Sequence, residues 1–304
     1  MKDMYPENSI IGIDGRDDRR KEASELFGIN TFKNLTDIES LVDCAFICTS
    51  PLSHAEIIND CLKRGWNVFT ELNLVDDRYE ENMSLARKNN CILFLSSTFF
   101  YREEIQYIRS KITGDRKWNY IYHVGQYLPD WHPWENYNDF FVGCKETNGC
   151  REILAIELPW LIATFGKICK ADVQSDKITK LNVDFDDNYM IQITHENGNK
   201  GSLIVDVVSP CAVRKLEAYT EGKYLAWSGT PESIFEYNPI SKKMDHVDLE
   251  ERSEHRQEYT SFIVENAYRN EIREFFDVVL SGKKPIYGFE QDKIVLDLID
   301  LWGA

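Results

Sequence analysis

The chain has no hydrophobic run approaching the roughly 18–20 residues that cross a bilayer, and its first residues, MKDMYP, lack the apolar segment of a signal peptide. It also has no lysine- or arginine-rich run, because 35 Lys and Arg stand against 51 Asp and Glu, a net charge of −16. A negative protein repels the phosphates of nucleic acids. We therefore expect no membrane partner, no nucleic-acid partner and a cytoplasmic location.

The eight cysteines are scattered, with no Cys-x-x-Cys pair and no cysteine and histidine cluster at the spacing of a metal site. Several have apolar neighbours, as in the segment from Cys44 to Cys48. Buried thiols in a reducing compartment are therefore favoured over disulfides. The sequence predicts neither a bound metal ion nor a disulfide framework.

What the sequence does contain is enough apolar material, 43% of 304 residues, for two domains of ordinary size. In the first third, short apolar runs alternate with amphipathic segments, as in a parallel sheet covered by helices. Strands are expected at 9–14, 44–48, 67–70 and 91–95. Helices are expected up to Phe27 with Gly28 as the terminator, from the capping boxes Thr36-x-x-Glu39 and Ser53-x-x-Glu56, and over 77–89. This is the pattern of a doubly wound α/β unit.

Beyond about residue 115 the expected strands become longer and alternate polar and apolar residues. The runs 189–194 and 201–208 are joined through Asn197-Gly198, a strong hairpin signal. This half should therefore carry an open, largely antiparallel sheet, with a helix at 151–165 that Pro159 is expected to kink and another at 261–280. We place the domain boundary between residues 112 and 113.

Two segments of the first half point to a cofactor. Asp14 closes an apolar strand before Gly15, where dinucleotide-binding sheets place an acid for the adenosine ribose. From Thr49 to Asn73 the chain has a Thr-Ser-Pro turn, a histidine that opens a helix, and a glycine followed by a strand that ends in Glu-Leu-Asn. Three later segments are also distinctive: GQYLPDWHPWENY at 125–137, TNGCRE at 147–152 and YRNE at 268–271.

Together these features resemble the glucose-fructose oxidoreductase/inositol dehydrogenase (Gfo/Idh/MocA) family, especially its sugar and sugar-nucleotide branch. The resemblance implies a Rossmann-like, dinucleotide-binding domain over 1–112 that takes NAD or NADP. It implies for 113–304 an α/β domain with an open, largely antiparallel sheet that supplies the substrate site and often the oligomer interface. We therefore expect a homo-oligomer.

The start of the chain departs from the family pattern. The family opens with a strand and Gly-x-Gly-x-x-Gly, whose glycines let the backbone approach the pyrophosphate, and this motif occurs nowhere here. The first strand and the motif are thus missing, and we expect a truncated chain or a misassigned start, because losing a central strand would leave buried backbone groups unpaired. The end at Ala304 also comes earlier than is usual in the family.

The acid–base residues of the family are altered as well. Its Glu-Lys-Pro is Glu71-Leu72-Asn73 here, and its catalytic histidine aligns with Ile156, or with Glu157 if the register slips by one. Glu157 would serve as a base only if burial raised its pKa, and the alternative is a helix-surface carboxylate. His132 is the second candidate for proton transfer, against the alternative of a hydrogen-bonded loop histidine.

The resemblance and the strand ends suggest where a dinucleotide would bind. The candidate cofactor-binding residues are Asp14, Arg16, Thr49, Ser50, Pro51, His54, Glu71 and Asn73. Asp14 slightly favours NAD, because a carboxylate repels the 2′-phosphate of NADP, whereas Arg16 would pair with that phosphate or is a solvated charge. His54 is more typical of a capping or packing residue than of a catalyst.

The aromatic segment 125–137 suggests the substrate. Aromatic faces beside polar groups suit a sugar, which has apolar C–H faces and polar edges, although such a loop also packs for solvent exclusion alone. The candidate substrate-binding residues are Tyr127, Trp131, Trp134 and Arg151. Arg151, with Arg102 and Lys145, would meet an anionic group by charge-assisted hydrogen bonds or is a plain surface cation.

We therefore predict an NAD(P)-dependent oxidoreductase acting on a sugar or sugar-nucleotide derivative, with surface polysaccharide biosynthesis as a candidate role. The alternative is a non-catalytic sugar-binding or scaffold protein that retains the fold, favoured by Leu72 and Ile156, which both remove proton-transfer capacity. A third interpretation is redox-assisted glycoside cleavage.

Overall fold

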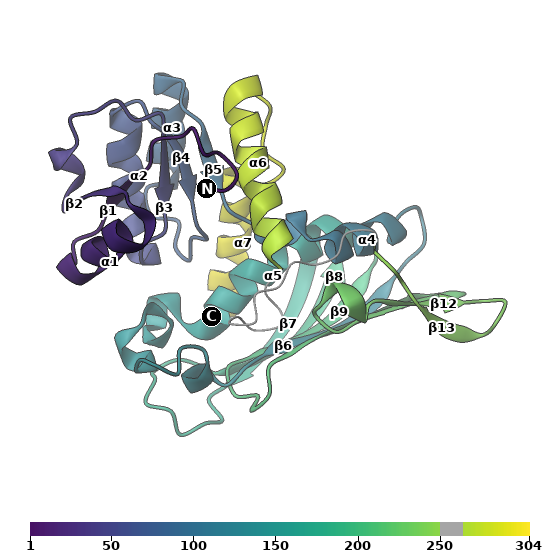
Figure 1. The fold of residues 1–304 in the computed structure, drawn as a ribbon. Helices are drawn as coiled ribbons and strands as arrows, with labels where there is room; N and C mark the ends of the chain where they lie inside the picture. The colour runs from purple at the N-terminus through teal and green to yellow at the C-terminus, as the bar shows by residue number, and fades with distance from the viewer. Residues whose placement is uncertain (250–263) are drawn as a thin grey trace. The chain divides into compact units, whose positions relative to one another are not determined.

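The computed structural model of the chain describes residues 1–249 and 264–304 (Figure 1). It divides into two compact units, residues 1–43 and 44–304, and each is described by itself. Both units follow the α/β class that the sequence predicts.

The first unit is a small parallel β-α-β arrangement. Strand β1 (Ile11–Ile13) pairs in parallel with β2 (Asn30–Phe32), and helix α1 (Asp17–Phe27) connects them. Gly28 ends α1 as predicted, with a left-handed φ of 58° and its N–H donated to the carbonyl of Ser24.

The prediction of a helix that begins at Thr36 is wrong. The chain makes one short 3-10 turn, η1 (Leu35–Asp37), and its capping box is formed by Asn34 and Asp37. Leu41, which a helix from Thr36 would carry on its apolar face, is fully exposed. Only Ile38 of this segment is buried, and one anchored side chain stabilises a short helix too little to offset the cost of its nucleation.

The second unit begins with a three-stranded parallel sheet in the order β3-β4-β5. The strands are β3 (Cys44–Ile47), β4 (Asn67–Thr70) and β5 (Leu93–Leu95), and the connecting helices are α2 (Pro51–Lys63) and α3 (Tyr79–Asn89). The expected strands are confirmed, but the capping box at Ser53 is wrong, because Ser50 is the N-cap of α2. Pro51 takes the first helical position, where its fixed φ and missing N–H carry no cost.

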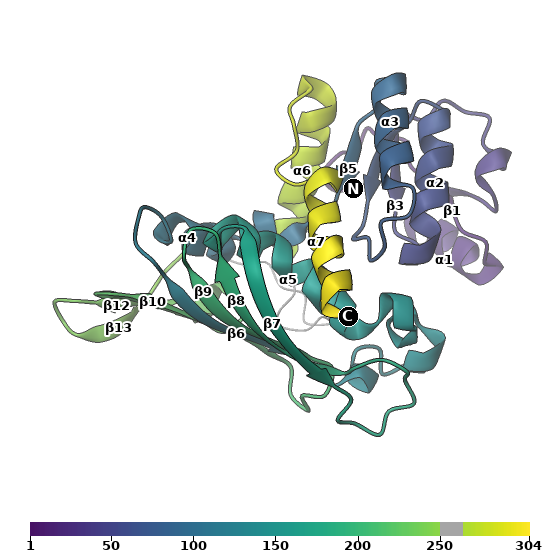
Figure 2. The ribbon, with the colours of Figure 1, turned by 180° about the vertical axis from the view of Figure 1, so that it is seen from behind.

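Two C-terminal helices of the same unit return to this parallel sheet. They are α6 (Glu265–Ser281) and α7 (Phe289–Trp302), and both lie beside it in Figure 2. The ring of Phe275 on α6 packs edge-on against Phe69 and Phe94, with centroids 5.6 Å apart in both pairs. Helix α6 confirms the helix predicted near 261–280 over its described part, since 261–263 lie outside the described residues. Helix α7 was not predicted.

The second sheet has eight strands in the order β13-β12-β11-β10-β6-β9-β8-β7. Among the described strands of this sheet only β6 and β9 pair in parallel, so the sheet is largely antiparallel, as predicted. The strands are β6 (Asn119–Gly125), β7 (Ile168–Asp176), β8 (Asn188–His195), β9 (Lys200–Asp206), β10 (Val213–Thr220), β11 (Lys223–Trp227), β12 (Phe235–Asn238) and β13 (Lys243–His246). The hairpin of β8 and β9 turns at Gly198, whose φ is 87°.

Helix α5 (Gly149–Phe165) packs on β8 and β9 of this sheet and on α7. It continues through Pro159, and its Leu154, Leu158 and Trp160 are fully buried. The remaining helical segments are α4 (Glu103–Lys111) and the short 3-10 turns η2 (Thr98–Tyr101), η3 (Leu128–Asp130), η4 (Tyr137–Asp139), η5 (Phe141–Gly143), η6 (Lys145–Thr147) and η7 (Pro231–Ser233). Among the described residues no helix is long and apolar enough to span a membrane. The boundary predicted between residues 112 and 113 stays a prediction.

Candidate functional site

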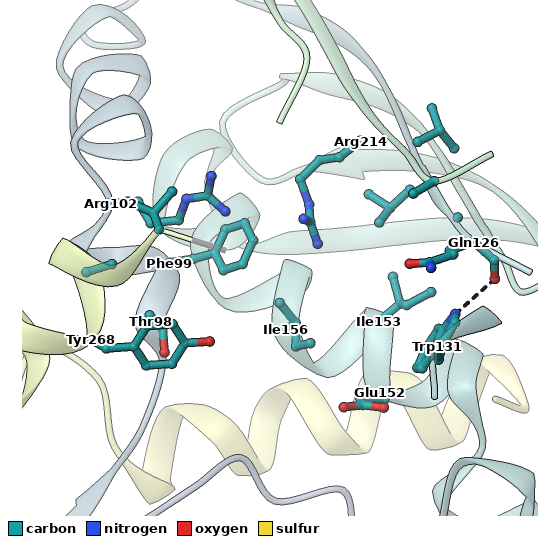
Figure 3. Close-up of a pocket in the computed structure, with 16 residues that line it drawn as sticks. Thr98, Phe99, Arg102, Gln126, Trp131, Glu152, Ile153, Ile156, Arg214 and Tyr268 are labelled. Atoms are coloured by element: carbon teal, nitrogen blue, oxygen red, sulfur yellow. Dashed lines mark hydrogen bonds between the residues drawn. The ribbon is translucent and has the colours of Figure 1, made fainter. Parts of the chain in front are cut away.

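A cavity of about 260 Å³ lies within the second unit, between the start of α5 and the start of β10 (Figure 3). Its walls come from η2 and the residue after it, the end of β6, the first turns of α5, the start of β10 and the start of α6. Phe99 and Trp131 give it aromatic surface, and Gln126 and Thr98 add polar groups. It is the candidate substrate site.

The acidic group of this cavity is Glu152, in the first turns of α5. Its Oε2 is shielded from solvent and has no hydrogen-bond partner among the described residues. Burial raises the pKa of this carboxyl to about 7, and the negative charge of Glu71 acts in the same direction. Glu152 can therefore gain and lose a proton near neutral pH.

Two arginines face the cavity at its other side. The guanidinium carbons of Arg102 and Arg214 lie 4.8 and 5.0 Å from the ring centroid of Phe99. Arg102 donates to Glu104 at 2.7 Å and to the carbonyl of Gly229 at 2.7 Å. In the view of Figure 3, Ile156 lies between Arg214 and Glu152. The cavity thus separates fixed cations from a carboxyl group.

Glu157 does not line this cavity. It is fully buried, so the helix-surface alternative is wrong. Its Oε1 accepts from the guanidinium of Arg214 at 2.8 Å, and its Oε2 accepts from Tyr122 and Trp160 at 2.6 and 2.7 Å. This carboxylate holds Arg214 in place, and its lone pairs are taken by these neighbours.

The carboxyl ends of the parallel strands carry the candidate cofactor residues of the second unit. Thr49, Ser50 and Pro51 follow β3, and Glu71 follows β4. His54 is buried, with Nδ1 2.7 Å from Oδ1 of Asn73 and Nε2 2.8 Å from the carbonyl of Thr49. It therefore links the loops after β3 and β4. The Nδ2 of Asn73 is buried with no hydrogen-bond partner among the described residues.

A further carboxyl group, that of Glu271, contacts the residues that follow β5 at the same sheet edge. Glu271 of α6 accepts from Oγ of Ser96 at 3.0 Å, from the N–H of Ser97 at 2.6 Å and from Oγ1 of Thr98 at 3.1 Å. Burial raises its pKa to about 7 despite these bonds. Glu271 therefore fixes the loop between β5 and η2 together with the start of η2, whose Thr98 and Phe99 line the cavity.

Asp14 and Arg16 belong to the first unit. Oδ1 of Asp14 accepts the backbone N–H of Arg16 at 2.8 Å. The side chain of Arg16 donates to Asp18 at 3.2 Å, and both members of this pair are exposed. Arg16 thus forms a solvated ion pair with Asp18 in this structure. The carboxylate of Asp14 lies directly after the end of β1.

Of the predicted substrate residues, Trp131 lines the cavity, and its Nε1 donates to the carbonyl of Gln126 at 3.0 Å. Tyr127, Trp134 and His132 do not line it. Trp134 is 77% exposed, and Nδ1 of His132 lies 2.7 Å from Glu135. The segment 125–137 thus contributes one aromatic side chain, that of Trp131, and the polar side chain of Gln126 to the cavity.

Arg151 is buried away from the cavity. It donates to the carbonyl of Leu74, to Asp300 at 2.7 Å and to the carbonyl of Ala304 at 2.7 Å. Because these bonds fasten α5 to the C-terminal end of the chain, Arg151 has a structural contact in place of the expected substrate contact.

Sequence reasoning missed five residues at or beside the cavity. They are Phe99, Glu152, Arg214, Tyr268 and Glu271. One signal was available for Glu152: it precedes Ile156 by four residues and so shares its helix face. No groups of histidine, cysteine or acidic residues arranged to hold a metal ion occur in the described part of the chain.

Residues 2–97 match the model of the family GFO_IDH_MocA, described as an oxidoreductase family with an NAD-binding Rossmann fold. No curated protein matches the chain. Over residues 2–97 this match confirms the family resemblance, and with it the Rossmann-like fold class and the nicotinamide dinucleotide as the cofactor class.

Several solved structures have the same fold. UDP-N-acetylglucosamine 3-dehydrogenase GnnA from Acidithiobacillus ferrooxidans superimposes with a TM-score of 0.75 at 15% identity, covering 97% of this chain and 89% of that one. The WlbA dehydrogenase from Bordetella pertussis, in complex with NADH and UDP-GlcNAcA, has a TM-score of 0.72 at 12% identity, with 96% and 85% covered. Levoglucosan dehydrogenase, in complex with NADH and levoglucosan, has a TM-score of 0.76 at 14% identity, with 97% and 88% covered.

Proposed function

We propose that this chain, whose residues 2–97 belong to the Gfo/Idh/MocA oxidoreductase family with its NAD-binding Rossmann fold, is an NAD(P)-dependent oxidoreductase of a sugar or sugar-nucleotide derivative. The family match carries the proposal. The cavity supports the substrate class, because the rings of Phe99 and Trp131 suit the C–H faces of a sugar while Gln126, Glu152 and Arg214 suit its hydroxyl edges.

The residues of this chain fit a dinucleotide at the carboxyl ends of its parallel strands, where open α/β sheets bind ligands. Thr49, Ser50 and Pro51 would hold it after β3, and Glu71 and Asn73 after β4. The side chains of Thr49 and Ser50 are exposed at this edge, so their hydroxyl groups are accessible to a ligand. When bound, the dinucleotide supplies or accepts the hydride, and the protein supplies orientation and proton transfer.

Asp14 at the end of β1 would bind the adenosine ribose of the dinucleotide. Its half-buried carboxylate favours NAD, whereas Arg16, already paired with Asp18, is poorly available for the 2′-phosphate of NADP. We therefore propose NAD as the preferred cofactor.

The substrate-side roles follow from the packing. Arg214 and Arg102 hold the polar edge of the substrate, and Glu157 positions Arg214 through their ion pair. Trp131 covers an apolar face. We propose that Tyr127, Trp134 and His132 shape the neighbouring loop, since they lie outside the cavity.

The first test is a fluorescence titration with NADH and NADPH, followed by assays of NADH formation from NAD with UDP-N-acetylglucosamine and with levoglucosan. We expect saturable NADH binding and turnover of a sugar probe. Trp131→Ala should raise KM for the sugar and leave the NADH affinity unchanged, and Trp134→Ala is the matched aromatic control. Sugar binding by a chain that does not bind NADH would overturn the oxidoreductase and support the non-catalytic sugar-binding protein.

We also propose a homo-oligomer, formed through the face of the eight-stranded sheet opposite α5. This face exposes 46% of Ile121, 47% of Met190 and 38% of Tyr219, while the alternate residues of the same strands are buried. A second copy would cover these apolar groups. Light scattering should give a multiple of the 35.5 kDa chain mass, and Ile121→Glu with Met190→Glu should reduce it to one chain.

A further inference from the structure

We propose that the sugar bound in this cavity carries a methyl group, which packs on an apolar wall formed by Ile153, Ile156 and Val124. A 6-deoxy sugar and an acetamido sugar both supply such a group. The inference rests on the proposed function, because it specifies the substrate class of the same site. It also gives a role in substrate choice to Ile156, where the resemblance predicts the loss of the family's histidine.

The apolar wall comes from one helix and one strand. Ile153 and Ile156 are three residues apart on α5, so their side chains lie on the same face of the helix. Ile153 is buried, and Ile156 is half-buried. Val124, near the end of β6, is buried as well. All three line the cavity, so the helix and the sheet both contribute methyl groups to it.

This wall lies among the polar groups of the cavity. In Figure 3, Ile156 lies between Arg214 and Glu152, and Ile153 lies between Ile156 and Trp131. A sugar whose hydroxyl edge meets Arg214 and whose apolar face meets Trp131 therefore turns a further substituent toward the two isoleucines. The chemistry of the isoleucines decides which substituent binds well there.

A methyl group suits this position better than a hydroxyl group. The side chains of Ile153 and Ile156 have no donor or acceptor, and their backbone groups lie inside a helix, where they are paired with each other's turns. A hydroxyl group placed against them loses its hydrogen bonds to water and receives none in exchange, which weakens binding. A methyl group gains by leaving water.

The two sources of the methyl group differ in what else they need. In a 6-deoxy sugar the methyl carbon is bonded to the ring carbon directly. In an acetamido sugar it follows an amide, whose N–H and carbonyl need partners. The side chains of Thr98 and Gln126 line the cavity and offer both donors and acceptors. The shared feature is the methyl group, and the experiment separates the two sources.

The test measures dissociation constants by calorimetry on the full chain saturated with NADH. The ligands are glucose, 6-deoxyglucose and N-acetylglucosamine, each as the free sugar and as the UDP-sugar. We expect at least one methyl-bearing sugar to bind about 10–100-fold more tightly than its glucose reference. A preference for 6-deoxyglucose identifies a ring methyl, and a preference for N-acetylglucosamine identifies an acetamido methyl. No preference in either comparison, or no binding of any of these sugars, would overturn the proposal.

Variants of the apolar wall test the cause of the preference. Ile156→Thr puts a hydroxyl group into the wall and should lower the preference about tenfold, while the NADH affinity stays unchanged. Ile156→Val removes a single carbon and should lower it less. Ile162→Thr is the matched control, because Ile162 is a half-buried residue of the same helix outside the cavity. A preference that Ile156→Thr and Ile156→Val both leave intact would also contradict the proposal.

NADH binding separates this inference from the function on which it rests. A chain that binds NADH, and binds UDP-glucose as tightly as both methyl-bearing UDP-sugars, loses only this inference. A chain that binds no NADH loses the proposed oxidoreductase function, and the same ratios measured without NADH still decide whether the cavity prefers a methyl group.

Discussion

The carboxylate of Glu157 holds the guanidinium of Arg214 beside the cavity, with Nη2 and Nε both donating to Oε1 at 2.8 and 3.1 Å. The acid comes from α5 and the base from β10, so the pair joins the helix to the sheet. Only Arg214 reaches the cavity. The pair therefore fixes a cation at the substrate site without exposing the acid.

Removing Glu157 should destabilise the protein strongly. Glu157→Ala leaves a buried guanidinium without its partner, which costs about 3–5 kcal/mol in comparable cases. Urea unfolding measures the effect. Asp172→Ala breaks the exposed pair with Lys170 and should change the stability little. Equal midpoints for Glu157→Ala and the wild type would contradict this account.

The link between α3 and α7 should depend on pH. Asp292 accepts from Tyr79 at 2.6 Å and from Tyr287 at 2.8 Å, and burial raises its pKa from 3.8 to about 6. Because the folded pKa is the higher one, the folded state binds the proton more tightly. This carboxyl therefore lowers the free energy of unfolding progressively as pH rises from about 4 to 6, and the full penalty remains above that.

Tyr79→Phe tests this link, because it removes a donor to the carboxylate. We expect a loss of about 1–3 kcal/mol at pH 8 and a smaller loss at pH 5, where Asp292 is mostly protonated. Urea unfolding at both values gives the comparison, with Tyr237→Phe at a half-buried tyrosine of β12 as the control. An equal loss at the two pH values would show that Asp292 does not titrate in this range.

Gly201 should not tolerate a side chain. A Cβ on this residue of β9 would lie 1.9 Å from Cζ of Tyr120, whose ring stacks on Phe165 and whose hydroxyl lies 3.1 Å from Nε2 of His195. Gly201→Ala should cost at least about 1–3 kcal/mol. Gly15→Ala, with no atom within 4 Å of the new Cβ, is the control.

The reason for that cost can be checked by a double-mutant cycle. In a Tyr120→Leu background the ring is gone, so Gly201→Ala should cost less than in the wild type. The same cost in both backgrounds would mean that the clash with Tyr120 is not the cause.

His54→Ala should weaken two properties at once. It leaves the buried Oδ1 of Asn73 and the carbonyl of Thr49 without this partner, which costs about 1–3 kcal/mol. It also loosens the loops after β3 and β4, so the NADH affinity should fall. Thermal unfolding and NADH titration measure both, and His246→Ala is the exposed control. Unchanged NADH affinity would place the dinucleotide away from these loops.

Sequence patterns over a few neighbouring residues correctly predicted the elements that depend on those residues alone. The strands at β3, β4 and β8, the turn at Gly198 and the terminator Gly28 all depend on nearby residues. Where an element needed distant partners, prediction failed. The segment after Thr36 buries Ile38 but leaves Leu41 exposed and forms only a 3-10 turn, and α7 depends on α3 and α5 for its buried face.

The sequence by itself indicated the parallel α/β pattern, the largely antiparallel second sheet and the family resemblance, and through that resemblance it predicts that Leu72 and Ile156 stand where the family has its lysine and histidine. Only the tertiary structure decided which carboxyl reaches the cavity. Glu152 and Glu157 are five residues apart on one helix, and nothing local separates them. The packing of β10, which brings Arg214 to Glu157, and the charge of Glu71, which acts on Glu152, give one acid a structural partner and leave the other facing the cavity.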